Sequence, residues 1–332
     1  MSWDVVGHEW AERLLAGHIR RGEVRHAYLF AGPPGIGRRT LALRFAQALN
    51  CPTPLEPGQP CRTCRTCAQI ERMQHIDLSV VQAERPGAML KVEQVRELQQ
   101  TINLLPYEAA YRVSLLLRFH EANANAQNAL LKTLEEAPAR VILLLTADSP
   151  DELLPTIASR CEVLRLRPLA LDRLEAELRA RGLDESQARL LAHFSGGRLG
   201  KALHLKDGPA LLKARGEMLG EWVRLVPSGR AERFVYVEGL TRGERSKEPA
   251  RLAFLTWLSA WRDVMLAAAG PDLPLANPDY AEAIRELAGQ VSFAQARACV
   301  RELERGLGRL DANVNPRLLA EVLLLDWPRV AL

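Results

Sequence analysis

A glycine-rich loop near the amino terminus is the first stretch whose residues could do chemistry. Residues 32–40 read GPPGIGRRT, with glycines at Gly32, Gly35 and Gly37. Gly32 and Gly37 have the spacing of the phosphate-binding pattern G-x-x-x-x-G-K-[ST]. Backbone amides in such a loop could form an anion nest at the start of the following helix. A glycine-rich turn without any ligand is the alternative that the loop alone leaves open.

Side chains that a working nucleotide loop needs are replaced here. The Lys that would reach the β- and γ-phosphates is Arg38, and the hydroxyl that would hold Mg²⁺ is Arg39. Thr40 follows one residue too late. An Arg can bind phosphate, but no side chain in this loop is placed to carry the metal. The sequence therefore predicts a degenerate nucleotide loop.

Four cysteines that follow the loop have the spacing of a metal site. Cys51, Cys61, Cys64 and Cys67 give the pattern C-x9-C-x2-C-x2-C among turn residues. Four thiolates in a tetrahedron suit Zn²⁺, and a closed set leaves no open position for catalysis. We therefore expect structural zinc that stabilises a small insertion. The alternative, free thiols in a mobile loop, would leave four reactive sulfurs without a partner.

Composition limits the classes of protein to which the chain can belong. Its 332 residues are enough for two or three domains, and 48% hydrophobic with 25% charged residues is ordinary for a globular protein. The net charge of +4 permits contact with nucleic acid without arguing for it. No apolar run has the length of a membrane helix, and the start lacks a secretory pattern. We expect a cytoplasmic protein without membrane contact.

The elements that must position these residues alternate between strand and helix in the first half of the chain. Helical patterns cover about 40–49, 91–104 and 128–136, and a further one lies around residues 10–18. Strands that are largely apolar are expected at 27–31, 78–81, 112–117, 141–146 and 162–166. This alternation predicts an α/β domain with a parallel sheet.

The predicted helices of the first half each have an apolar face at helical spacing. Their expected buried positions are Trp10, Leu14 and His18; Leu41, Phe45 and Leu49; and Leu130, Leu131 and Leu134. From residue 167 onward only helical periodicity continues. Trp257 and Trp261, spaced i, i+4, are interpreted as core and not as a stacking site.

Several stretches together resemble the clamp-loader subunits of the AAA+ class. Besides the loop and the cysteine cluster, they are residues 128–138 (NALLKTLEEAP), 159–161 (SRC), 196–198 (GGR) and 313–319 (NVNPRLL). The similarity covers the whole chain in order. The resemblance is closest to the δ′ branch of bacterial DNA polymerase III, whose members do not hydrolyse ATP.

The resemblance implies a three-part architecture. Residues 1–166 would form an AAA+ (P-loop type) α/β parallel-sheet domain with the four-cysteine zinc module at about 51–67. Residues 167–206 would form a small helical lid domain, and residues 207–332 an all-α collar domain that oligomerises.

Two further positions separate the δ′ branch from the active ATPases of the γ/τ branch. In the active relatives the third strand ends in Asp-Glu, which serve Mg²⁺ and the attacking water; the positions here are Leu117 and Arg118. An apolar residue cannot serve the metal, and an Arg stays protonated, so it cannot act as a base. We therefore expect no intrinsic ATPase activity and no tight ATP or ADP binding, although weak binding through the amide nest stays open.

Arg160 is the residue on which the resemblance places function. In this family the Arg of the Ser-Arg-Cys triplet resembles an arginine finger that acts in trans on nucleotide held by the neighbouring subunit. A purely intramolecular salt bridge is the alternative. Arg198 lies where active relatives place a nucleotide-sensing Arg (sensor 2), and a structural role is the alternative there.

The resemblance implies a subunit that helps load the sliding clamp on primed DNA, in a hetero-oligomeric ring with γ/τ and δ. One alternative is an active γ/τ-type ATPase, against which Leu117 and Arg118 argue. Another is an independent zinc and DNA-binding module, which would bind duplex DNA in a salt-sensitive way without partners.

Overall fold

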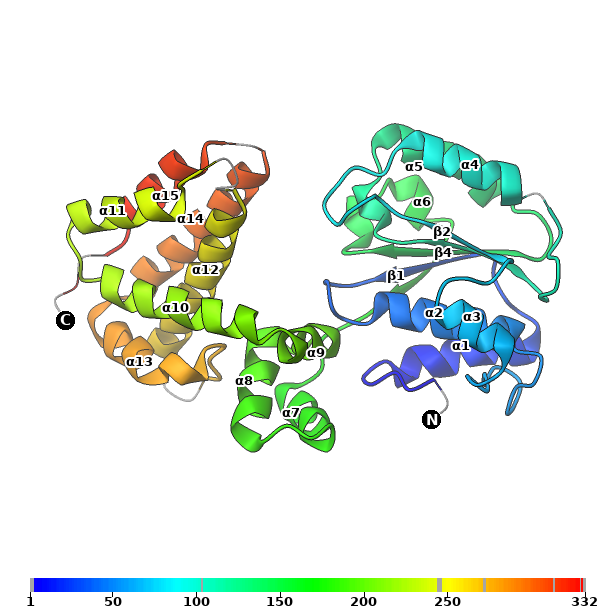
Figure 1. Ribbon diagram of the computed structural model, residues 1–332, viewed down its shortest axis with the longest axis horizontal. Helices are drawn as coiled ribbons and strands as arrows, with labels where there is room; N and C mark the ends of the chain where they lie inside the picture. The colour runs from blue at the N-terminus through cyan, green and yellow to red at the C-terminus, as the bar shows by residue number, and fades with distance from the viewer. Residues whose placement is uncertain are drawn as a thin grey trace. The chain divides into compact units, whose positions relative to one another are not determined.

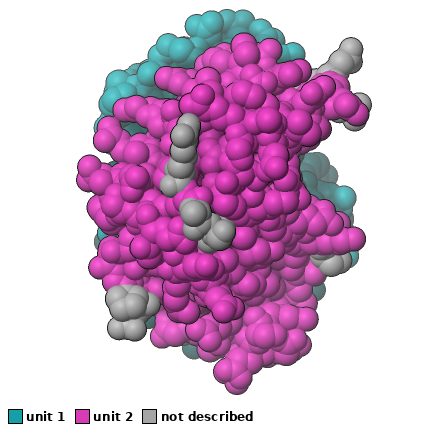
Figure 2. Space-filling model, turned by 90° about the vertical axis from the view of Figure 1, so that its left-hand side faces the viewer, with its two compact units in different colours: residues 1–169, 198–201 teal, residues 170–197, 202–332 magenta. Residues whose placement is uncertain are grey.

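The computed structural model describes residues 3–102, 104–243, 247–270, 273–312, 314–328 and 330. The chain divides into two compact units: unit 1 is residues 1–169 with 198–201, and unit 2 is residues 170–197 with 202–332 (Figures 1 and 2). Asn313, which begins one of the stretches that carry the family resemblance, lies outside the described residues.

Unit 1 is built on a five-stranded parallel sheet. The strands are β1 (Ala27–Ala31), β2 (Leu78–Val81), β3 (Arg112–Leu116), β4 (Val141–Ala147) and β5 (Glu162–Arg165). Their order is β2-β3-β4-β1-β5, and every neighbouring pair is parallel. The predicted parallel α/β sheet is confirmed. Its central strands are buried on both faces, which explains their continuous apolar sequences.

Helices cover both faces of this sheet. Figure 1 shows α1, α2 and α3 on one face and α4, α5 and α6 on the other. Because side chains alternate along a strand, Tyr28 and Phe30 of β1 join the core under α1 and α2, whereas Leu29 joins the core under α4 and α5. The elements are α1 (Glu9–Arg21), α2 (Arg38–Asn50), α3 (Arg65–Glu71), α4 (Val92–Ile102), η1 (Phe119–Glu121), α5 (Ala124–Glu135), η2 (Pro150–Glu152) and α6 (Pro155–Ala158).

Three helical details differ from the sequence-based expectation. The buried face of α1 is centred on Ala11 and Leu15; the expected burial is confirmed for His18 and wrong for Trp10, which is 41% exposed. Helix α5 begins at Ala124, earlier than expected, because Asn123 caps it by accepting from the N–H of Ala126. Leu131 of α5 is only half-buried. The expected buried face of α2 is confirmed.

Among the described residues of unit 2, all regular secondary structure is helical. Its elements are α7 (Leu171–Ala180), α8 (Glu185–Ser195), α9 (Leu199–Asp207, whose first turn belongs to unit 1), α10 (Pro209–Leu225), α11 (Arg230–Leu240), α12 (Lys247–Ala269), η3 (Pro278–Tyr280), α13 (Ala281–Gln290), α14 (Phe293–Asp311) and α15 (Pro316–Leu325).

Helix α12 lies at the centre of unit 2. Trp257 and Trp261 are fully buried on it and pack edge-on against Trp327, which confirms their interpretation as core. By length and composition alone, residues 249–269 could cross a membrane, contrary to the expectation that no apolar run is long enough. The burial of its aromatic side chains in the unit 2 core explains why this helix is so apolar.

Candidate functional site

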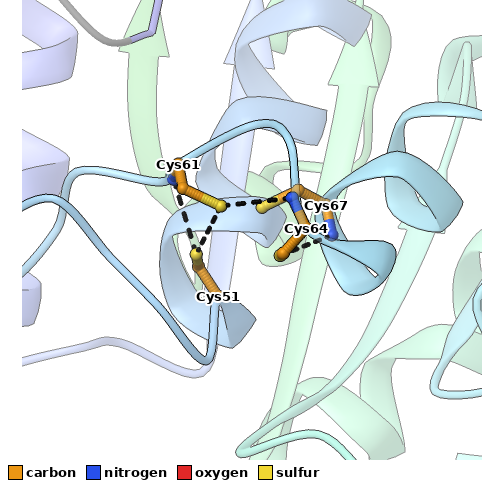
Figure 3. Close-up of side chains that lie close together, drawn as sticks. All are labelled: Cys51, Cys61, Cys64 and Cys67. Atoms are coloured by element: carbon orange, nitrogen blue, oxygen red, sulfur yellow. Dashed lines mark hydrogen bonds between the residues drawn. The ribbon is translucent and has the colours of Figure 1, made fainter.

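The four cysteines converge on one point. Their sulfur atoms all lie within 4.8 Å of one another, and three of the residues are half-buried while Cys67 is buried (Figure 3). Cys51 follows the end of α2, Cys61 and Cys64 lie on the loop after it, and Cys67 lies in the first turn of α3. The arrangement brings together all four residues that the spacing predicted.

Hydrogen bonds to these sulfurs favour the thiolate form, whereas burial opposes it. The backbone N–H groups of Cys61, Cys64 and Cys67 donate to the sulfurs of Cys51, Cys61 and Cys64, at 3.4, 3.3 and 3.4 Å. Burial opposes ionisation of the Cys61 thiol, but hydrogen bonds from Thr53 and from the N–H of Cys64 outweigh it and lower the pKa of Cys61 to about 5. Burial raises the pKa values of Cys64 and Cys67. A bound cation would offset that cost.

The cysteine loop is anchored to the body of unit 1. The indole of Trp3 donates to the carbonyl of Gly58 at 2.9 Å, and Gln47 on α2 donates to the carbonyl of Cys67 at 2.8 Å. Gly58 has a positive φ of 85°, and a Cβ there would lie 2.9 Å from the Cα of Ala16 on α1. These contacts fix the backbone from which the sulfurs project.

Four sulfurs at this separation fit a metal ion. A tetrahedral ion with metal–sulfur bonds of about 2.3 Å places its ligand sulfurs about 3.8 Å apart, which is within the observed limit of 4.8 Å. The described residues therefore hold a cluster that can bind a metal such as zinc. Because all four positions of the tetrahedron would be filled by protein, such an ion would have no open position for substrate.

The glycine loop has the backbone of a strand–turn–helix connection at the carboxyl end of β1. Gly35 and Gly37 have φ values of 80° and 108°, which glycine tolerates and other residues rarely adopt. A Cβ at Gly32 would lie 2.7 Å from the carbonyl oxygen of Leu166. The spacing of the glycines is thus required by this backbone, whether or not the loop binds an anion.

The first turn of α9 packs directly on this loop within unit 1. The N–H of Gly200 donates to the carbonyl of Gly35 at 2.9 Å, and a Cβ on Gly35 would lie 2.8 Å from the backbone nitrogen of Lys201. Arg198, at the predicted sensor position, donates to the carbonyl of Pro34 at 3.4 Å, and burial lowers its pKa. In these contacts, two backbone carbonyls of the loop accept hydrogen bonds from other residues of the protein.

Arg38 does not extend toward solvent as a phosphate ligand would. Its Nη1 lies 2.5 Å from an oxygen of Asp148, which follows β4, and its side chain is only 10% exposed. His120 lies 3.5 Å from the same oxygen. Arg39 and Thr40 are exposed. Arg38, at the position of the phosphate-binding Lys, is therefore used in an ion pair within the protein. Arg39, at the position of the metal-binding hydroxyl, is exposed.

The two positions after β3 have structural surroundings. Leu117 is 3% exposed and belongs to the core under α1 and α2. Arg118 has a φ of 50° and donates through Nε to both carboxylate oxygens of Glu121 at 3.0 Å. Neither side chain can hold a metal or accept a proton from water.

Arg160 lies between α6 and β5, with 36% of its side chain exposed. Its Nη2 donates to Glu135 Oε1 at 2.7 Å, and its Nη1 donates to the carbonyl of Thr156 at 2.9 Å. The intramolecular salt bridge considered in the sequence analysis is therefore present in this chain. Burial raises the pKa of the neighbouring Cys161 to about 12, which makes that thiol unreactive at neutral pH.

Asp148, His120 and Glu135 were not predicted as site residues. A signal existed for Asp148, because polar residues that follow parallel strands gather at one edge of a sheet. No spacing rule links Glu135 with Arg160 or Asp148 with Arg38, since those pairs are 25 and 110 residues apart.

Family models match most of the chain. The model described as DNA polymerase III, delta subunit, matches residues 7–170, and the one for the C terminus of the delta subunit matches residues 245–329. The chain is 30% identical over 332 residues to the DNA polymerase III subunit delta′ of Pseudomonas aeruginosa, and the alignment covers 96% of each protein.

A second group of relatives is longer. The chain is 35% identical over 210 residues to the DNA polymerase III subunit tau of Salmonella typhimurium, which is 61% of this chain and 32% of tau. It thus spans about a third of that relative. Among solved structures, a DNA polymerase III gamma subunit-related protein from Thermotoga maritima matches with a TM-score of 0.50 and 14% identity, covering 96% of this chain and 97% of that one. At that identity the likeness shows the fold alone.

Proposed function

The chain belongs to the DNA polymerase III delta′ family, and from this premise we propose that it is a clamp-loader subunit that helps load the sliding clamp on primed DNA without hydrolysing ATP itself. The observation that carries this proposal is the state of its nucleotide loop. The Lys position is an Arg whose guanidinium already binds Asp148 of the same unit.

Phosphoryl transfer requires a phosphate clamp, a metal and a positioned water at the same time. In this chain Arg38 is paired, Arg39 is exposed, and Leu117 is part of the core. Arg118 is paired with Glu121 and cannot act as a base. With all four positions replaced, we expect no ATPase activity from the chain alone.

We propose that Arg160 acts on nucleotide held by a neighbouring γ/τ-type subunit. Its guanidinium is partly exposed, and the salt bridge to Glu135 is a surface pair, which is worth at most about 1 kcal/mol. Such a contact does not prevent the guanidinium from binding phosphate oxygens. An arginine supplied in trans stabilises the charge of the transferring phosphoryl group and raises rates by about 10³–10⁵ in comparable systems.

We propose that the metal is zinc and that its role is structural. The thiolate set is closed, and the loop between Cys51 and Cys61 contributes little apolar burial of its own. Metal analysis of freshly purified protein should find about one Zn²⁺ per chain. The variant Cys64→Ser should lose the metal and expose the loop to proteases. A metal content far below one per chain would contradict this assignment.

The three-part architecture remains part of the proposal. The sheet domain would carry the zinc module, the short helices after it would form a lid, and the remaining helices a collar that assembles with γ/τ and δ subunits. Arg198, bound to the loop carbonyl of Pro34, would have a structural role in this arrangement. The chain would work in the cytoplasm, through contacts with partners and not with a membrane.

The test is a comparison of the chain alone with the reconstituted complex. Alone, the chain should show neither ATP hydrolysis nor duplex DNA binding. In a complex with the γ/τ-type ATPase of the same organism, Arg160→Ala should reduce ATP hydrolysis by about 10³ at the adjoining site. Arg167→Ala, which removes another exposed arginine of unit 1 at the opposite end of β5, is the control and should have no effect.

The outcomes separate this proposal from its rivals. Brisk hydrolysis by the chain alone would favour an active γ/τ-type ATPase. Salt-sensitive duplex binding without partners would favour an independent DNA-binding module. An unchanged rate in the Arg160→Ala complex would refute the trans-acting role of Arg160.

A further inference from the structure

We propose that Glu135 is a positioning residue for Arg160. It would fix the guanidinium in the orientation that binds the phosphate of the neighbouring subunit. This inference rests on the proposed function of Arg160. It adds a second residue to that site, one that acts through the arginine and does not touch nucleotide itself.

Two anchors from different helices hold the guanidinium. Glu135 is the last residue of α5 and binds Nη2 at 2.7 Å, while Thr156 of α6 binds Nη1 through its carbonyl at 2.9 Å. One contact would leave the planar group free to rotate about a single hydrogen bond. Two contacts to separate nitrogens define the plane of the group.

Both anchors stand on well-packed elements. Leu134, next to Glu135, is 2% exposed, and Ile157, next to Thr156, is fully buried. The two side chains belong to the same hydrophobic core, under α4 and α5. The position of the guanidinium is therefore set by helices packed in that core and not by a free loop.

The two anchors leave part of the guanidinium available. An arginine has five N–H donors, and the two contacts use one on each terminal nitrogen. Three donors are not used by these contacts, and the side chain is 36% exposed. A long side chain that is already fixed loses less conformational entropy when it meets its ligand. Glu135 would thus contribute to the rate of the chemical step more than to binding.

The chain offers a matched control one residue away. Glu136 carries the same charge and is exposed, but among the described residues it forms no ion pair with Arg160. If the negative charge at the end of α5 acts without a specific contact, substitution of Glu135 and substitution of Glu136 would have the same effect on ATP hydrolysis. A change that acts through the contact to Arg160 would appear only at Glu135.

The experiment measures steady-state ATP hydrolysis by the complex of this chain with the γ/τ-type ATPase of the same organism. Glu135→Gln should lower kcat by about threefold to tenfold, because the amide accepts a hydrogen bond but loses the charge. The KM for ATP and the elution volume of the complex should not change. Glu136→Gln should match the wild type in every measurement.

A double variant tests the coupling. When Arg160→Ala is already present, Glu135→Gln should cause no further loss of kcat, since its effect passes through the arginine. A further loss in that background would overturn the inference, as would a raised kcat in Glu135→Gln alone, which would show that Glu135 competes with phosphate.

The failure of this inference can be told from failure of the proposed function. If Arg160→Ala lowers kcat and Glu135→Gln does not, Arg160 acts in trans but Glu135 does not position it. If Arg160→Ala itself has no effect on kcat, the proposed trans role of Arg160 is refuted, and the inference about Glu135 is refuted with it. Thermal unfolding of Glu135→Gln should match the wild type, because the residue is exposed.

Discussion

Arg38 and Arg160 lie in two regions of unit 1. Each pairs with a carboxylate, but Arg38 is nearly buried and Arg160 is partly exposed to solvent. Arg38 is 10% exposed and binds Asp148 at 2.5 Å, while Arg160 is 36% exposed and binds Glu135 at 2.7 Å. Both are guanidinium–carboxylate pairs within one chain. Burial, and not the chemistry of the pair, decides whether the arginine remains available to a ligand.

The physical basis is the cost of separating the two charges. A pair removed from water must keep its partner, since an unpaired charge in a low-dielectric site is expensive. A pair at the surface is screened, and its arginine can bind a further anion at small cost. Of these two arginines, Arg160 is therefore the one whose surroundings fit the proposed action on an external phosphate.

The largest effect expected from this comparison is a loss of stability when the buried Arg38 loses its partner. Asp148→Ala leaves Arg38 nearly buried without its carboxylate, and we expect a loss of about 2 kcal/mol in the free energy of unfolding. Denaturant unfolding of the full chain measures it. Glu152→Ala, at an exposed carboxylate in the same segment, is the control and should change stability by less than about 0.5 kcal/mol.

The corresponding substitution at the exposed pair should have a smaller effect. Glu135→Ala should cost less than about 1 kcal/mol in the same unfolding measurement, because the pair is partly solvated. A loss as large as that of Asp148→Ala would show that the Arg160 pair is a structural element. The contrast between the two regions would then disappear.

The smallest effect is expected when the loop is restored by itself. The double substitution Arg38→Lys with Arg39→Thr recreates the loop pattern, but Leu117 and Arg118 still supply neither a metal ligand nor a base. We expect no ATP hydrolysis above the background of the unmodified chain. Measurable turnover by this variant would mean that the positions after β3 are not limiting.

Much of the fold could be predicted from local patterns. Strand β2 was expected at its observed residues, and the buried face of α2 follows from the spacing of Leu41, Phe45 and Leu49. Trp10 of α1 was misassigned because it is apolar but lies beside the buried stripe. Periodicity alone does not tell a large exposed side chain from a small buried one such as Ala11.

The cysteine cluster and the arginine pairs show which sites local sequence patterns can predict and which they cannot. The cysteines lie close together in sequence, so their spacing predicted a shared site that the structure then assembled. The partners of Arg38 and Arg160 are 110 and 25 residues away. No local pattern joins them, because each pair forms only after separate helices and strands have packed.

The sequence by itself determined which chemical groups are present: four thiols with metal-site spacing, a loop without its Lys and hydroxyl, and an arginine after Ser159. Covalent spacing is sufficient for these conclusions, since each depends on neighbours along the chain. Only the tertiary structure decided how each group is used. It placed Asp148 on Arg38 and Glu135 on Arg160, and it buried Arg38 beside a half-buried Asp148 while leaving the second pair at the surface. Burial depends on packing between distant segments, which no local stretch of sequence records.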